Sequence, residues 1–307
     1  MTDPPVLDVE VEDTTRPFRV ITHKPGLAAG FAKFGGTQDV GVVVDSSLAD
    51  QTLWWMSQDW AIQVLKAGIE LPQLLAPTPG WLAGPLRRFM HRKVGTLLKR
   101  DVPRFFAQNL ELLSEHPQVV LSVPGEHPEL LAPQLVPAAD LAVGLPAQYA
   151  ALPDATLLQL DEPLSCVAEV RCWVAHGTVT TFAPYRLGVV GWDSNLFLEM
   201  LFNTEGQKLT EGAVDTAKVI AAEVDGPPGY ALDIGVTVDG ITTVLRVWPA
   251  WAAEPLHADP SGVFTALVAA HDFDHVAEKW RWKPDRNVYA RPQTATPDQT
   301  KESPDEQ

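Results

Sequence analysis

The chain has 307 residues, with 23 Lys and Arg against 39 Asp and Glu, and its formal net charge is −16 at pH 7. This charge argues against a nucleic-acid partner or an anionic membrane surface, because long-range repulsion would oppose approach. The sequence holds no apolar run near the roughly 20 residues that cross a bilayer, and its amino terminus lacks a basic-then-apolar signal segment. We therefore expect a cytoplasmic protein with no nucleic-acid or membrane partner.

The first third of the chain predicts a tail followed by a mixed lobe. Residues 1–16 carry five acidic residues and little that could pack, which indicates a disordered acidic tail. We assign residues 17–104 to an N-terminal α/β lobe. Buried strands are expected at 18–22 and 40–45, and apolar spacing predicts a helix over 53–67.

A basic segment closes this lobe. In an acidic chain it is a local field of opposite sign and a candidate anion or partner site. A solvated helix face is the commoner explanation of such a run. Its seven basic residues are Arg87, Arg88, Arg92, Lys93, Lys99, Arg100 and Arg104.

Residues 105–283 predict a larger second domain in which strands dominate. We expect a helix over 105–115, a strand over 118–123, strands between 156 and 187, and helices over 210–224 and 260–271, the last capped by Asp259. The predicted fold class is therefore α/β (α+β). Residues 284–307 are rich in Pro, Thr, Gln and acidic residues and predict a disordered tail.

Two residue pairs invite a cross-link or a metal. Cys166 and Cys172 lie on one predicted strand, about 20 Å apart, which is too far for a disulfide, so we expect reduced thiols. His271 and His275 have the i, i+4 spacing of zinc ligands. They lack the Glu placement of a metalloprotease helix, and we expect them to cap a helix end with exposed rings.

The most informative stretch is residues 229–251. It predicts two strands joined by the turn dipeptide Asp239-Gly240. With a two-residue loop, Asp233 lies directly opposite Arg246, where opposite charges on one sheet face attract. An ordinary surface ion pair, worth less than about 1 kcal/mol, is the plain interpretation.

This hairpin resembles the end of an ATP-grasp domain. There a Leu-Asp-hydrophobic-Gly strand precedes a strand that ends Glu-x-Asn-Pro-Ala-Trp, and the Asp, Glu and Asn hold Mg²⁺ against the ATP phosphates. Asp233 matches, and so do the residues 249–251, but Arg246 and Trp248 replace the Glu and the Asn. Magnesium needs oxygen ligands, whereas guanidinium and indole offer only N–H donors.

Other segments extend the resemblance toward stand-alone bacterial and phage members. Residues 169–171 and 185–186 look like the family's Glu-x-Arg strand and return strand, and Asp161-Glu162-Pro163 resembles the hinge that grips adenine and ribose. Val123 stands where the family's phosphate-contacting Lys is expected. The resemblance implies an N-terminal α/β lobe followed by two β-rich subdomains that enclose a cleft. The candidate cofactor-binding residues are Glu162, Glu169, Arg171, Arg186, Asp233 and Arg246, and no catalytic residue or metal ligand is assigned.

Two hypotheses follow. In the first, the chain is a degenerate ATP-grasp protein, a pseudoenzyme that binds an unidentified protein or small molecule, and Arg246 neutralises Asp233 and fills the metal pocket. Bidentate binding of a phosphate is the other role open to Arg246. In the second, the chain remains an ATP- and Mg-dependent carboxylate–amine ligase that forms an acyl phosphate, with Arg171, Arg186 and Arg246 in place of the missing cations.

Overall fold

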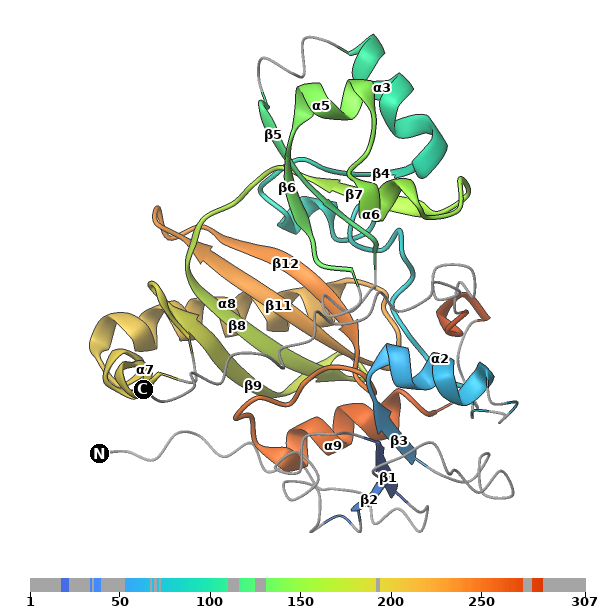
Figure 1. Cartoon of the computed structure of the whole chain (residues 1–307). Helices are drawn as coiled ribbons and strands as arrows, with labels where there is room; N and C mark the ends of the chain where they lie inside the picture. The colour runs from blue at the N-terminus through green and yellow to red at the C-terminus, as the bar shows by residue number, and fades with distance from the viewer. Residues whose placement is uncertain are drawn as a thin grey trace, which may run out of the picture.

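The computed structural model describes residues 18–21, 34, 36–39, 53–66, 68, 71, 73–109, 116–124, 131–191, 194–272 and 278–283. The strands of this part of the chain form three sheets. Figure 1 shows a parallel sheet at the bottom, a large antiparallel sheet in the middle and a smaller antiparallel sheet at the top. The predicted tails at 1–16 and 284–307 and the predicted strand at 40–45 lie outside the described residues.

The parallel sheet belongs to the N-terminal lobe. Its central strand β1 (Phe18–Ile21) pairs with β2 (Gly36–Asp39) and β3 (Leu53–Met56). The helix predicted over 53–67 is therefore wrong in its first turn, since helix α2 (Gln58–Lys66) begins only after β3. All four side chains of β3 are buried, and a short apolar run buried on every side does not distinguish strand from helix by periodicity.

The smaller antiparallel sheet has the order β4-β7-β5-β6. Its strands are β4 (Val94–Leu98), β5 (Gln118–Ser122), β6 (Gln134–Pro137) and β7 (Leu157–Asp161). One face packs on α3 (Val102–Gln108) and α5 (Ala138–Val143), with Leu121 and Leu158 in the shared core. The short helix α6 (Ala147–Ala150) adds Tyr149, whose hydroxyl donates to the Leu121 carbonyl at 2.7 Å. Because side chains alternate along a strand, the opposite face carries Ser122, Gln159 and Asp161.

The basic segment is not one helix face. It forms the 3₁₀ turns η3 (Arg87–Phe89) and η4 (Lys99–Asp101) on either side of β4. β4 pairs with β7 along its whole length, so it shares a sheet with strands beyond residue 105. The domain boundary between residues 104 and 105 stays a prediction.

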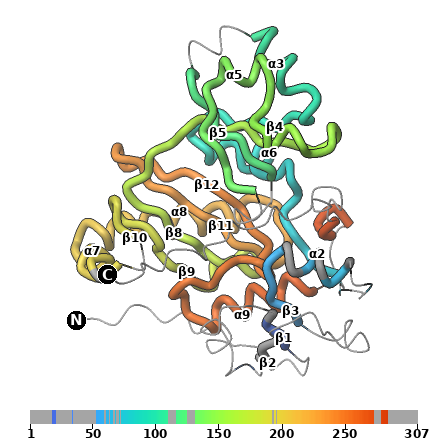
Figure 2. The backbone as a smooth tube through the Cα atoms, viewed as in Figure 1, coloured from blue at the N-terminus to red at the C-terminus, as the bar shows by residue number. Residues whose placement is uncertain are grey.

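The large antiparallel sheet has the order β10-β9-β8-β11-β12. Its elements are β8 (Cys166–Ala175), β9 (Thr178–Leu187), β10 (Val190–Gly191), β11 (Gly229–Thr237) and β12 (Thr242–Pro249). One face is covered by α8 (Thr204–Glu223), with α7 (Asn195–Leu201) beside it. The other face meets α9 (Pro260–Ala269) and the N-terminal lobe in a separate core. Figure 2 traces the chain from the smaller sheet into β8 of the large sheet.

The β11–β12 hairpin pairs Asp233 with Arg246, as predicted, but by a different route. Its loop has three residues, 238–240, instead of two, with Gly240 at φ +78°, the left-handed position that such loops require. A bulge then inserts Leu245 as an extra residue on β12. The two one-residue shifts cancel, so the distal half of β12 presents the predicted face.

Most of the fold expectations are confirmed. The two antiparallel sheets are the β-rich subdomains, Asp259 caps α9 through the Gly262 N–H at 3.3 Å, and both cysteines are free and buried. The exposed ring predicted for His271 is wrong. Its ring is buried, and Nε2 accepts from the Trp54 amide at 3.1 Å, because α9 packs beneath β3; the structure does not describe His275. None of the helices within the described ranges is long and apolar enough to cross a bilayer.

Candidate functional site

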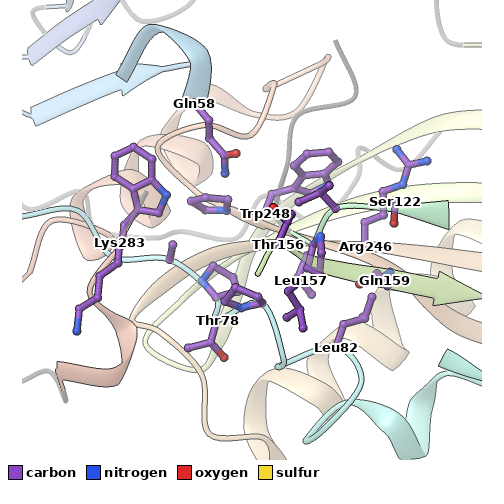
Figure 3. A pocket seen from close by; sticks show the side chains of 18 of the residues that line it. Gln58, Thr78, Leu82, Ser122, Thr156, Leu157, Gln159, Arg246, Trp248 and Lys283 are labelled. Carbon is purple, nitrogen blue, oxygen red and sulfur yellow. The ribbon is translucent and has the colours of Figure 1, made fainter. Parts of the chain in front are cut away.

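A cavity of about 420 Å³ lies between the two antiparallel sheets. Strands β5 and β7 form one wall, β12 forms the facing wall, and the segments at 76–82 and 279–283 close the sides. Figure 3 shows side chains from these elements gathered around one space, among them Arg246, Gln159 and Trp248. A volume of this size accepts a small molecule.

The β7 wall is polar and deeply buried. Asp161 Oδ2 accepts a hydrogen bond from Gln159 Nε2 at 2.7 Å, while Asp161 Oδ1 and Thr156 Oγ1 have no hydrogen-bond partner among the described residues. Asp161 is 9% exposed and Thr156 is 2% exposed. Buried polar atoms are normally satisfied, so two orphaned atoms on one cavity wall indicate a place for a ligand group.

Burial also perturbs the ionisation of this wall. Desolvation raises the pKa of Asp161, opposed by the charge of Arg92, the Gln159 hydrogen bond and the charge of Arg246. Arg92 itself donates to the Leu245 carbonyl at 3.1 Å and to the Val244 carbonyl, which ties the approach to β4 to the bulge of β12. Burial lowers the pKa of Arg92, and Asp161 counteracts that effect.

The partner expected for Asp233 is wrong. Arg171, on β8, donates to both carboxylate oxygens of Asp233, from Nε at 2.7 Å and from Nη2 at 3.0 Å, and Trp248 Nε1 donates at 2.7 Å. Arg246 lies opposite Asp233 in the strand register, yet it is exposed and lines the cavity. Asp233 sits on the middle strand between two arginines, and the buried arginine forms the ion pair.

Aromatic rings enclose this ion pair. The Arg171 guanidinium lies 5.1 Å from the ring centre of Trp248, 5.8 Å from that of Tyr185 and 6.0 Å from that of Trp173. Its Nη1 donates to the Glu254 carbonyl at 3.1 Å. The positive charge is therefore satisfied on every side by hydrogen bonds and by ring faces.

The donor set at this position does not fit Mg²⁺. Asp233 is 1% exposed, and its oxygens already accept three N–H hydrogen bonds. The neighbouring positions on β12 offer the N–H groups of Arg246 and Trp248, and neither group can coordinate a cation. Within the part of the chain that the structure describes, no group of three or more His, Cys, Asp or Glu is arranged to hold a metal.

The remaining predicted site residues lie outside the cavity lining. Glu169 and Arg186 face each other across β8 and β9 and form an ion pair of 2.7 Å. Glu162 turns toward β4, where one carboxylate oxygen accepts from the Lys93 amide at 3.1 Å and the other lies 3.4 Å from His116 Nδ1. Of the six candidates, Arg246 alone belongs to the lining of this cavity.

Sequence reasoning missed the residues that the cavity brings together. Asp161, one position before the predicted Glu162, lies on the inner face of β7 with Gln159 and Leu157. Two-residue alternation along the strand could have identified this set. Nothing in the local sequence indicated that 279–283 would return to the same place.

Three basic side chains at the side of the cavity already have acidic partners. Lys279 Nζ lies 2.5 Å from Asp225, while Arg281 and Lys283 lie 3.0 and 3.2 Å from Glu278. All three are well exposed, so these ion pairs are screened by water and contribute little to stability.

Comparison with known proteins agrees with this architecture. Residues 135–267 match a family model described as an ATP-grasp domain, the third family of its clade. The structure of D-cycloserine synthetase DcsG is similar at a TM-score of 0.52 and 14% sequence identity, over 82% of this chain and 98% of that one. D-alanine–D-alanine ligase from Bacillus anthracis, solved with ATP, gives a TM-score of 0.47 and 11% identity, over 83% and 96% of the two chains. No curated protein matches the sequence significantly.

Proposed function

Because the chain has an ATP-grasp fold, with a cavity between its two antiparallel sheets, we propose that it is a pseudoenzyme, a binding or regulatory protein without ATP-dependent ligation. The observation that carries this proposal is the closed state of Asp233. Arg171 and Trp248 occupy the carboxylate oxygens that a metal would need. The buried free thiols favour a reducing compartment, so the proposal includes the cytoplasm.

The phosphate side of the cleft supports the same conclusion. Val123, at the position of the family's lysine, lines the cavity with an apolar side chain. Arg171 and Arg186 are held by Asp233 and Glu169, which leaves Arg246 as the one predicted substitute cation that lines the cavity. A triphosphate would place several negative charges there, and phosphoryl transfer normally depends on metal ions and cations that neutralise them.

Calorimetric titration of the full chain with ATP, with and without Mg²⁺, tests the proposal. We expect no metal-dependent binding in the micromolar range. Metal-dependent binding in that range would instead favour the alternative function, an ATP-dependent carboxylate–amine ligase that forms an acyl phosphate.

Restoring the two family ligands is the complementary test. The double variant Arg246→Glu, Trp248→Asn supplies two oxygen donors and removes one N–H donor from Asp233, so we expect a measurable gain in Mg²⁺ affinity by calorimetry. Lys208→Glu is a matched control, because it makes the same charge change on an exposed position of α8, across the sheet from the cavity. Equal affinity in the double variant and the control would contradict our assignment of the metal position.

A further inference from the structure

The charges that line the cavity balance to zero once existing ion pairs are removed. The lining includes four cationic side chains, from Arg246, Lys279, Arg281 and Lys283, and one carboxylate, from Asp161. The last three cations already pair with acidic residues. Among the described residues, no side chain hydrogen-bonds to or pairs with the Arg246 guanidinium, so one positive and one negative charge remain for a ligand.

These two remaining charges face each other without touching. Arg246 projects from β12, and Asp161 projects from β7 on the other wall. Arg246 stabilises the ionised form of Asp161 through space, but the two do not form an ion pair. A guanidinium and a carboxylate that share a cavity at a distance can be bridged by a molecule that carries both signs of charge.

The unsatisfied atoms point to a hydrogen-bond donor at the Asp161 end. Asp161 Oδ1 and Thr156 Oγ1 are both at least nine-tenths buried, and both lack partners in the described part of the chain. An ammonium group has three N–H donors and can satisfy both oxygens. It would also replace the solvation that Asp161 loses on burial.

The space between the two charged ends is apolar. Leu82, Val120, Leu157 and Val247 contribute to the lining. We propose that this cavity binds a zwitterionic amino acid with an apolar side chain, its carboxylate on Arg246 and its ammonium on Asp161 and Thr156. The inference rests on the proposed function, because it assigns to the cleft a ligand that needs neither a metal nor a phosphate site.

Titration calorimetry on the full chain tests this ligand class with three probes, L-leucine, L-methionine and L-phenylalanine. For any probe that binds, we compare the analogue that lacks the ammonium and the analogue that lacks the carboxylate; for leucine these are 4-methylpentanoate and 3-methylbutylamine. Each charge-assisted contact accounts for about tenfold in affinity or more, so each analogue should bind at least about tenfold more weakly. Failure of all three probes, or equal affinity for a one-charge analogue, would overturn the inference.

Charge-removing variants locate the site. Arg246→Met and Asp161→Asn should each weaken amino-acid binding by about tenfold or more. Lys283→Met and Asp154→Asn are the matched controls, because they remove the same charges from exposed residues that already have partners, and they should bind as the parent chain does. Thermal unfolding of every variant checks folding. Unchanged binding in Arg246→Met or Asp161→Asn would contradict the assignment.

The two proposals fail separately. Metal-dependent ATP binding would overturn the pseudoenzyme proposal. Absence of amino-acid binding, together with absence of ATP binding, would overturn only the ligand inference and leave the loss of ligation standing.

Discussion

Asp233 and Arg171 form a buried ion pair from which water is excluded. Asp233 is 1% exposed, and the guanidinium that it holds lies among three aromatic rings. Such a pair need not raise stability relative to an apolar core, but the loss of one partner leaves a buried charge without compensation.

Asp233→Asn should therefore be strongly destabilising. We expect it to lower the free energy of unfolding by about 3–5 kcal/mol, because Arg171 would stay buried beside a neutral amide. Glu223→Gln is the control, since Glu223 pairs with Arg88 where both side chains are more than half exposed, and it should cost less than about 1 kcal/mol. Urea denaturation measures both, and similar costs for the two variants would contradict the account of Asp233.

Asp161→Asn should stabilise the ligand-free protein, with a pH dependence of predictable sign. Burial raises the pKa of Asp161 above its unfolded value, so the parent chain loses stability as pH rises through the folded pKa. The Asn variant has no such loss, and its advantage should grow between about pH 4 and about pH 8. Urea denaturation at both pH values provides the measurement, and a constant difference would exclude this origin.

At single positions, the sequence predicted alignment better than partnership. Strand pairing placed Asp233 opposite Arg246, and the structure confirms that register. The same carboxylate also lies opposite Arg171 on the other side of its strand, and a hairpin pattern contains no information about that third strand. Burial then selected Arg171, because Trp248 covers it, whereas Arg246 faces the cavity.

At the level of elements, α9 and β9 approach each other closely at Gly262. A Cβ built at this glycine would lie 2.5 Å from Thr181 Cβ and 2.6 Å from the Thr180 carbonyl oxygen. The Gly262 carbonyl also accepts from the Thr180 hydroxyl at 2.7 Å. The absence of a side chain at this position sets the distance between helix and sheet.

Gly262→Ala should destabilise the protein by about 1–3 kcal/mol, because the added methyl overpacks this contact. Gly212→Ala is a control of the same chemistry in α8, where the nearest atom to the new Cβ is 4.0 Å away. That change should stabilise the protein by about 0.5–1 kcal/mol, since alanine favours a helix interior. Opposite shifts in Tm would confirm both; equal shifts would contradict the packing argument.

Local signals predicted most elements but not their exact ends. Asp259 marked the start of α9, and alternation marked the strands of the large sheet. Residues 53–56 were assigned to a helix because their burial depends on a sheet formed with β1, more than 30 residues earlier in the chain. The hairpin loop and the bulge at Leu245 were both missed, and the register survived because their shifts oppose each other.

For the whole molecule, the family resemblance predicted an architecture that composition alone could not. It gave two β-rich subdomains around a cleft, which the two antiparallel sheets and the cavity between them confirm. It did not predict which groups would line that cavity. Residues 76–82 and 279–283 reach it through long-range packing, and Leu75 bridges to Arg281 in an isolated strand contact.

The contacts of Arg92 have a mechanical consequence for access to the cavity. This side chain comes from the segment leading into the smaller sheet, and it holds two carbonyls at the irregular point of β12. Spreading the two sheets would strip those carbonyls of their donor inside a half-buried seam, at a substantial energetic cost. We therefore expect a guest to enter through the exposed edge at Lys279 and Lys283, while the clamp itself stays shut.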